Sequence, residues 1–149
     1  MDEVQYSPIG VVHSPLAPDE HTPPRRLDRR GLEGTVEVFP QYAEGLRDLA
    51  GFSHVVLLCH LHLSSGFSLS VMPPGETVTH GVFATRSPRR PNPISLTVVR
   101  LLRTEGALLH VADLDLVDGT PVLDIKPYFT SIYNGDEVRT GWMKTRQVR

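Results

Sequence analysis

The chain has 149 residues, 40% of them hydrophobic and 21% charged, with a formal net charge of −2. This length fits one domain with its own core. The near-neutral charge excludes a protein that grips nucleic acid over a broad basic surface. The single cysteine, Cys59, excludes an internal disulfide and a multi-cysteine metal site. We expect a cytoplasmic protein, because no apolar run approaches the roughly 20 residues of a membrane helix and the polar start is no secretory signal.

The first third of the chain predicts an arm, a strand and a helix. Residues 13–33 predict an extended arm, because their first part is rich in proline and charge. Residues 35–39 alternate as a strand does. The stretch "QYAEGLRDLAGF" predicts one short helix that ends at Gly51. The apolar residues at helical spacing are Leu46, Leu49 and Ala50.

The rest of the chain predicts short strands separated by turns. "MPPGET" is a turn, "TEGA" joins the two strands of a hairpin, and "VDGTP" is a tight turn in which Gly119 can take a positive φ. This order favours an antiparallel sheet or barrel over βαβ units. The predicted strands after residue 53 are 54–64, one ending near Arg86, 94–103, 108–116 and 122–129.

The loop "FATRSPRRPNPIS" carries Arg86, Arg89 and Arg90 among three prolines. Proline excludes a helix or a central strand here, so the three guanidiniums sit on a stiff, irregular loop. A solvated turn is one interpretation. Stiffening, however, reduces the entropy lost on binding a ligand, and the arginine fork suits carboxylate or phosphate. We therefore expect a preorganised anion site.

An acidic cluster lies in "ADLDLVDGTPVLDIKPY". In a strand that ends at the turn, Asp113 and Asp115 share one face. Like charges on one face repel unless a cation or a hydrogen-bond donor lies between them, and a positively charged ligand or the nearby arginines would meet that need. For Asp118 we expect a turn role, with the carboxylate bonding its own backbone.

Three histidines flank the apolar strand "HVVLLCHLHLSS". His54, His60 and His62 would lie on the same face of the predicted strand, and three histidines can form a zinc site. Val56 and Leu58 lie on the same face, which favours a core face with polar ends, and we expect His62 to contact a ligand instead. Cys59 lies in an apolar run, where a thiol is usually inert packing. The sequence has no dinucleotide fingerprint, Walker loop or G-x-S-x-G elbow.

Four motifs appear together in order: "IGVVHSP", "GTVEVFPQYAEGLRDLAGFSH", "GVFATRSPRRPNPIS" and "LDLVDGTPVLDIKPY". Over residues 9–128 the chain resembles the TsaA-like (YaeB/TrmO) family, whose characterised members methylate N6 of threonylcarbamoyladenosine beside the tRNA anticodon. The resemblance implies a mainly β fold, a single-sheeted antiparallel barrel with one or two short helices. It also implies S-adenosylmethionine as cofactor without a Rossmann domain, and a homodimer with the cofactor near the subunit interface.

The resemblance also implies the residues of the site. Those that match the family's cofactor-binding positions are Arg26, Leu27, Asp28, His62, Leu63, Arg86, Leu96, Ala112, Asp113, Leu114 and Asp115. The chain departs from the family at Ser95, where relatives usually have glycine, and in the residues after "DIKPY". Residues 134–149 form a short tail, whereas longer bacterial relatives carry a further C-terminal domain.

The resemblance implies a single-domain methyltransferase that transfers a methyl group from S-adenosylmethionine to a tRNA adenosine, and we expect no metal and no membrane. Positioning supplies much of the rate of an in-line displacement. The urea-like nucleophile needs a base, for which Asp113 or His62 is the candidate. The alternatives are a methyltransferase with another substrate, a non-catalytic cofactor-binding or RNA-binding module, and a zinc hydrolase built on the three histidines.

Overall fold

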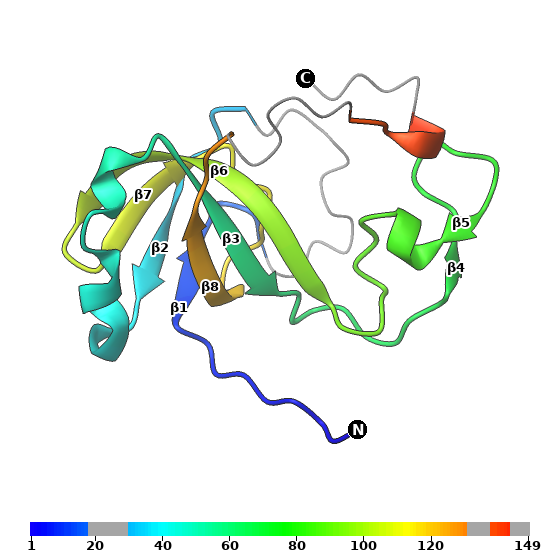
Figure 1. Cartoon of the computed structure of the whole chain (residues 1–149), viewed down its shortest axis with the longest axis horizontal. Coiled ribbons are helices and arrows are strands. Elements are labelled where there is room, and N and C mark those ends of the chain that lie inside the picture. Colours follow the sequence, from blue (N-terminus) through cyan, green and yellow to red (C-terminus); the bar gives the residue numbers. More distant parts are fainter. Residues whose placement is uncertain (18–29, 131–137, 144–149) are drawn as a thin grey trace.

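The computed structural model describes residues 1–17, 30–130 and 138–143. Six antiparallel strands close a barrel in the order β1-β2-β7-β6-β3-β8, which fills the left of Figure 1. The predicted β-barrel is therefore confirmed. The strands are β1 (Gly10–His13), β2 (Gly34–Val38), β3 (His54–His60), β6 (Ile94–Glu105), β7 (Leu108–Ala112) and β8 (Pro121–Pro127).

Alternation along the strands builds the barrel core, but in β3 it selects the face that we did not expect. Val55, Leu57 and Cys59 are fully buried, whereas the face of Val56 and Leu58 points outward. The expectation of a core on the histidine face is wrong. Both faces of β3 are apolar, so the pattern alone does not distinguish them. The pairing with β6 decides which face is buried, because the buried residues of β6 lie opposite buried residues of β3.

The predicted single helix after β2 is two 3₁₀ helices, η1 (Pro40–Leu46) and η2 (Leu49–Gly51). The break lies at Asp48, whose φ of 71° is left-handed and cannot continue a right-handed helix. Leu49 is buried in the core. The two turns therefore close one side of the barrel, as the cyan segment of Figure 1 shows, without forming an α-helix.

Residues 61–93, called the lobe from here on, connect β3 to β6 and stand to the right of the barrel in Figure 1. The expected strand ending near Arg86 is reduced to a two-residue ladder and a 3₁₀ turn. The turn before it is confirmed, since Glu76 N–H donates to the carbonyl of Pro73. The elements are β4 (Ser70–Val71), β5 (His80–Gly81) and η3 (Val82–Ala84); η5 (Gly141–Met143) lies beside them.

The hairpin of β6 and β7 is confirmed, and Gly106 turns it with a φ of 58°. Strand β7 ends at Ala112 rather than at residue 116, because Asp113 has a φ of 67°. Gly119 takes the expected positive φ, 84°. Strand β1 was not predicted. It has only four residues, and it completes the barrel by pairing with both β2 and β8. Among the described residues, no helix has the length and apolar character needed to cross a membrane.

Candidate functional site

Three of the sequence motifs meet at one end of β6. Thr97, buried on the inner side of this strand, donates its hydroxyl to Asp115 Oδ1 over 3.0 Å. On the other side of β6, Leu61 N–H donates to the carbonyl of Pro93 over 2.7 Å. The acidic segment after β7, the start of β6 and the segment after β3 are thereby held together. The sequence did not single out Thr97, because a threonine in a strand carries no signal of its own.

The arginine loop divides its three cations between two roles. Arg90 is structural, because its Nη1 donates to the carbonyls of Thr85 and Ser87, each at 3.1 Å. Arg86 and Arg89 are exposed, and neither makes an ion pair with a residue that the structure describes. The loop therefore holds two cations outward on a backbone that the third one fixes. This geometry supports the expected anion site.

His62 and Leu63 lie directly beyond β3, on the segment that faces the arginine loop. Both are exposed, Leu63 by 54%. Their segment is fixed to the loop by Ser64, whose hydroxyl donates to the carbonyl of Pro88 over 2.7 Å. His54 lies at the other end of β3, where its Nδ1 is 2.8 Å from the Ser53 hydroxyl. In the described part of the chain, no group of three or more His, Cys, Asp and Glu residues could hold a metal ion.

The two aspartates that were expected to share a face have different surroundings. Asp113 Oδ1 accepts from the Gly31 N–H at 2.7 Å, and its Oδ2 accepts from Arg100 Nε at 2.9 Å. Asp115 is more exposed and accepts from Thr97. Arg100 was not expected here; it comes from β6 and not from the arginine loop. It supplies the cation that the pair of like charges requires.

The residues around these aspartates fix the backbone. Ala112 and Leu114 are fully buried, and Leu114 N–H donates to the carbonyl of Leu32 at 3.2 Å. Asp118 has a turn role, as expected, but its carboxylate accepts from the Ser14 N–H at 3.0 Å and not from its own backbone. The segment after β7 is therefore tied to both ends of the segment 13–33.

Cys59 lies beneath this junction with no exposed surface. Burial is the main reason that the pKa of its thiol rises from 9.0 to about 12; the negative charge of Asp115 adds to the rise, and the Ser95 hydroxyl opposes it. The thiol is therefore protonated and inert at neutral pH, as the apolar run predicted. Apart from this contact with the thiol, the buried Ser95 Oγ has no hydrogen-bond partner among the residues that the structure describes.

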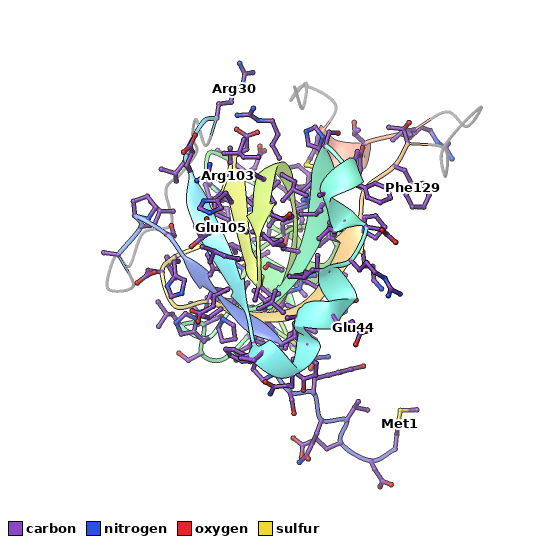
Figure 2. All side chains as sticks on the ribbon, turned by 90° about the vertical axis from the view of Figure 1, so that its left-hand side faces the viewer. Met1, Arg30, Glu44, Arg103, Glu105 and Phe129 are labelled. Atoms are coloured by element: carbon purple, nitrogen blue, oxygen red, sulfur yellow. The ribbon has the colours of Figure 1, made fainter. Side chains whose placement is uncertain are left out.

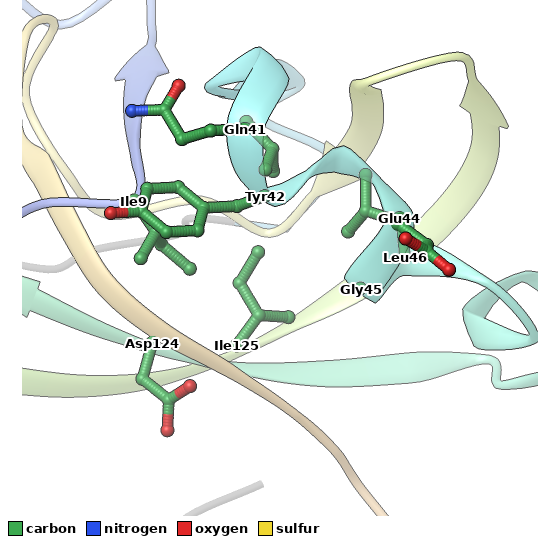
Figure 3. A pocket seen from close by; sticks show the side chains of 9 residues that line it. Ile9, Gln41, Tyr42, Glu44, Gly45, Leu46, Asp124 and Ile125 are labelled. Carbon is green, nitrogen blue, oxygen red and sulfur yellow. The ribbon is translucent and has the colours of Figure 1, made fainter.

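Arg26, Leu27 and Asp28 lie outside the described residues. In Figure 2, Arg30 projects from the upper end of the barrel, and Met1 lies beyond the lower end. A pocket of about 360 Å³ lies elsewhere, between η1 and β8, and none of the predicted site residues line it. Figure 3 shows Ile9, Tyr42 and Ile125 converging there. In Figure 1 the cyan segment that contains η1 lies at the left of the barrel, whereas the lobe with the arginine loop lies at its right.

The fold and site define a class: small β-barrel proteins with an arginine-rich loop and an acidic strand end at one junction. The chain belongs to the tRNA-methyltransferase O N-terminal domain family, whose model matches residues 11–134. A probable S-adenosyl-L-methionine-binding protein of Pyrococcus abyssi is 46% identical over 93% of this chain and 76% of its own. The tRNA (adenine(37)-N6)-methyltransferase of Escherichia coli is 38% identical over 86% of this chain and 59% of its own.

Among solved structures, TrmO from Pseudomonas aeruginosa superposes with a TM-score of 0.75 and 36% identity. The match covers 95% of this chain and 63% of that one. The chain therefore spans less than two thirds of this structure and of the Escherichia coli enzyme. Likeness over nearly all of this chain extends the family assignment to the whole barrel and the lobe.

Proposed function

We propose that the protein is an S-adenosylmethionine-dependent methyltransferase that methylates N6 of threonylcarbamoyladenosine beside the tRNA anticodon. Membership in the family and the names of the relatives support the reaction. The observation that carries the proposal is the junction at β6. There, the Thr97–Asp115 and Leu61–Pro93 hydrogen bonds bring three separate motifs together. A cytoplasmic location follows from a tRNA substrate.

The residues at this junction fit the cofactor's chemistry. S-adenosylmethionine carries a carboxylate, an ammonium group, a ribose and an adenine, and it supplies an electrophilic methyl group when bound. Arg86 is an exposed cation for the carboxylate, and Asp115 is an exposed acceptor for the ammonium or a hydroxyl. Leu63 and Leu96, exposed by 54% and 51%, offer apolar surface to the adenine. Arg26, Leu27 and Asp28, with the buried Ala112 and Leu114, complete the proposed pocket.

The chain's own residues orient the reactants and accept a proton. Asp113 has both carboxylate oxygens engaged, with Gly31 and Arg100, so accepting a proton there would disrupt contacts that hold the segment. His62 is exposed beside the arginine loop, and imidazole is the commonest general base near neutral pH. We therefore assign proton acceptance to His62. An Asp113→Asn enzyme that binds cofactor normally and has lost its turnover would reassign it to Asp113.

A homodimer forms part of the proposal, and an unpartnered apolar face supports it. On the outer side of the barrel, Leu58 on β3 pairs with Leu96 on β6, and Ile94 is 42% exposed beside them. A second copy that covers this face would remove these side chains from water. In sedimentation, Ile94→Glu should give monomers where the wild type is dimeric, and Val4→Glu in the N-terminal segment should not.

Two measurements test the activity. Titration calorimetry with S-adenosylmethionine should give saturable heat, whereas no heat at millimolar cofactor would reject the proposal. Incubation of tRNA with isotope-labelled cofactor, followed by mass spectrometry of the nucleosides, should place the label in the hypermodified adenosine. Cofactor binding without label in any tRNA nucleoside would reject the substrate and leave a methyltransferase acting elsewhere.

A further inference from the structure

An exposed aromatic ring stands beside the proposed site and has no role in the cofactor pocket. Phe83, in the turn η3, is 75% exposed, which makes it the most exposed of the chain's five phenylalanines. It lies three residues before Arg86. A large aromatic surface left in water has a cost that a partner's flat surface would remove. Phe83 is therefore a candidate contact for something that binds next to the cofactor.

The turn that carries this ring is held from three sides. Val82 is buried, and its N–H donates to the carbonyl of Leu69 at 3.0 Å. Thr85 Oγ1 donates to the carbonyl of Val82 at 2.8 Å. The indole N–H of Trp142 donates to the carbonyl of Ala84 at 2.9 Å. Because the backbone is already fixed, little entropy would be lost when the ring binds a ligand.

Small neighbours leave space beside the ring. Gly81, which precedes the turn, and Ala84, which follows the ring in the turn, are both exposed. A Cβ added at Gly81 would meet no atom within 4 Å, so this side of the turn is open. Bulky neighbours would have shielded the ring from a planar group. The local sequence instead leaves the ring exposed on a turn whose backbone is fixed.

A cation lies six residues further along the same loop. Arg89 is exposed, and it pairs with no acid that the structure describes. The neighbouring Arg90 fixes the loop backbone, so the position of Arg89 is constrained at its Cα. An exposed aromatic ring and an exposed guanidinium on one fixed loop form a combination that recognises single-stranded nucleic acid, because the ring stacks on a base and the cation neutralises a phosphate.

We propose that Phe83 stacks on an unpaired base of the substrate RNA loop while Arg89 contacts a phosphate of the same loop. The inference rests on the proposed function and adds to it the residues that hold the RNA. A net charge of −2 requires any such contact to be local, and the lobe provides a local one. The competing occupant is a second copy of this chain, and the measurements below separate the two.

The test is the binding of an anticodon stem-loop RNA at several salt concentrations. Phe83→Ala should weaken binding about tenfold or more, with an unchanged slope of log Kd against log salt, because a stacking contact releases no counterions. Phe83→Tyr should keep wild-type affinity. Arg89→Gln should lower the slope by about 0.7, the value for one phosphate of a single strand. Tyr6→Ala is the matched control, since Tyr6 is 74% exposed on the N-terminal segment.

Calorimetry with S-adenosylmethionine on the same variants separates the two proposals. A wild type that binds cofactor and methylates RNA, with a Phe83→Ala variant of equal RNA affinity, would overturn this inference alone. Loss of RNA affinity in Phe83→Ala would support it even if no methyl transfer were found. Wild-type protein that binds no stem-loop would overturn it. A Phe83→Ala variant that dissociates into monomers and keeps its RNA affinity per subunit would also overturn it, in favour of the second copy.

Discussion

The barrel and the lobe differ in how many of their side chains are buried. Along the barrel strands, fully buried side chains such as Val55, Leu57 and Val99 alternate with partly exposed ones. In the lobe, residues 61–93, Val82 is the one buried residue, and large side chains such as Phe67 and Leu69 are more than half exposed. The backbone of the lobe is fixed mainly by single hydrogen bonds to its neighbours.

This difference in burial predicts that the barrel provides most of the stability and that the lobe provides the groups that bind ligands. Burial of apolar surface is the dominant favourable term in folding, so the barrel supplies most of the stability. The lobe contributes little to that term and instead carries the exposed cations and aromatic rings. Substitutions in the lobe should therefore change ligand binding with little effect on unfolding, and substitutions in the barrel should do the reverse.

The largest expected effect is on the free energy of unfolding of the barrel. Leu57→Ala removes a fully buried side chain and leaves a cavity, so it should lower the free energy of unfolding by about 2–5 kcal/mol. Urea unfolding monitored by circular dichroism measures it. Leu69→Ala in the lobe is the matched control: Leu69 is 62% exposed, and its loss should change stability by no more than about 0.5 kcal/mol. Equal losses in the two variants would show that the lobe shares the core's role.

The second effect tests the lobe as a binding element. Arg86→Gln should weaken S-adenosylmethionine binding by about tenfold or more, because a hydrogen bond to a charged group is worth about 1.5–3 kcal/mol. The free energy of unfolding should stay at the wild-type value. Calorimetry and urea unfolding on one preparation measure both quantities. Arg103→Gln, at the far end of β6, should bind cofactor normally. If it loses affinity as much as Arg86→Gln, the effect is a general one of charge and the site lies elsewhere.

Sequence patterns predicted the barrel well, because strand alternation and turn chemistry are local. The β6–β7 hairpin and the turn at Gly119 needed no distant information. The prediction failed where a single backbone conformation or the pairing with a distant strand determines the structure. Asp48 breaks the expected helix through a left-handed φ, and the inner face of β3 depends on its pairing with β6. The lobe, with little regular structure, was assigned a strand that is mostly absent.

The site could be predicted in part. The resemblance to the family indicated Arg86, His62 and Asp115, whose roles stay a prediction, and the structure shows that all three side chains are exposed. Contacts such as Arg100 with Asp113 could not be predicted, since an arginine in a strand gives no sign of its partner. Nor could the different roles of the three arginines in the loop be predicted from the sequence, because those roles depend on which carbonyls the fold brings close.

The third prediction is a pH dependence that belongs to the barrel alone. The pKa of Cys59 is about 12 in the folded state and 9.0 ordinarily. Below pH 9 the thiol is protonated in both states, and its full contribution to stability is present. Above pH 9 the unfolded chain releases the proton first, so stability falls by up to about 1.4 kcal/mol per pH unit towards pH 12. Urea unfolding from pH 8 to 10.5 should show a steeper fall for wild type than for Cys59→Ala. Parallel curves would rule out the thiol as the cause.

The smallest expected effect tests whether Trp142 supports the lobe alone or also the barrel. Trp142 donates to the carbonyl of Ala84 and stacks on His80 with ring centroids 4.2 Å apart, so it fixes the turn before the arginine loop. Trp142→Phe keeps a stacking ring and loses the hydrogen bond, worth about 0.5–1.5 kcal/mol. Hydrogen exchange should accelerate several-fold at the amide of Thr85, whose bond to Val82 closes this turn, and remain unchanged in β3. Cofactor affinity should fall modestly, because Arg86 is then less well positioned. Faster exchange throughout β3 would mean that Trp142 supports the barrel, and the division between a stabilising barrel and a binding lobe would no longer hold.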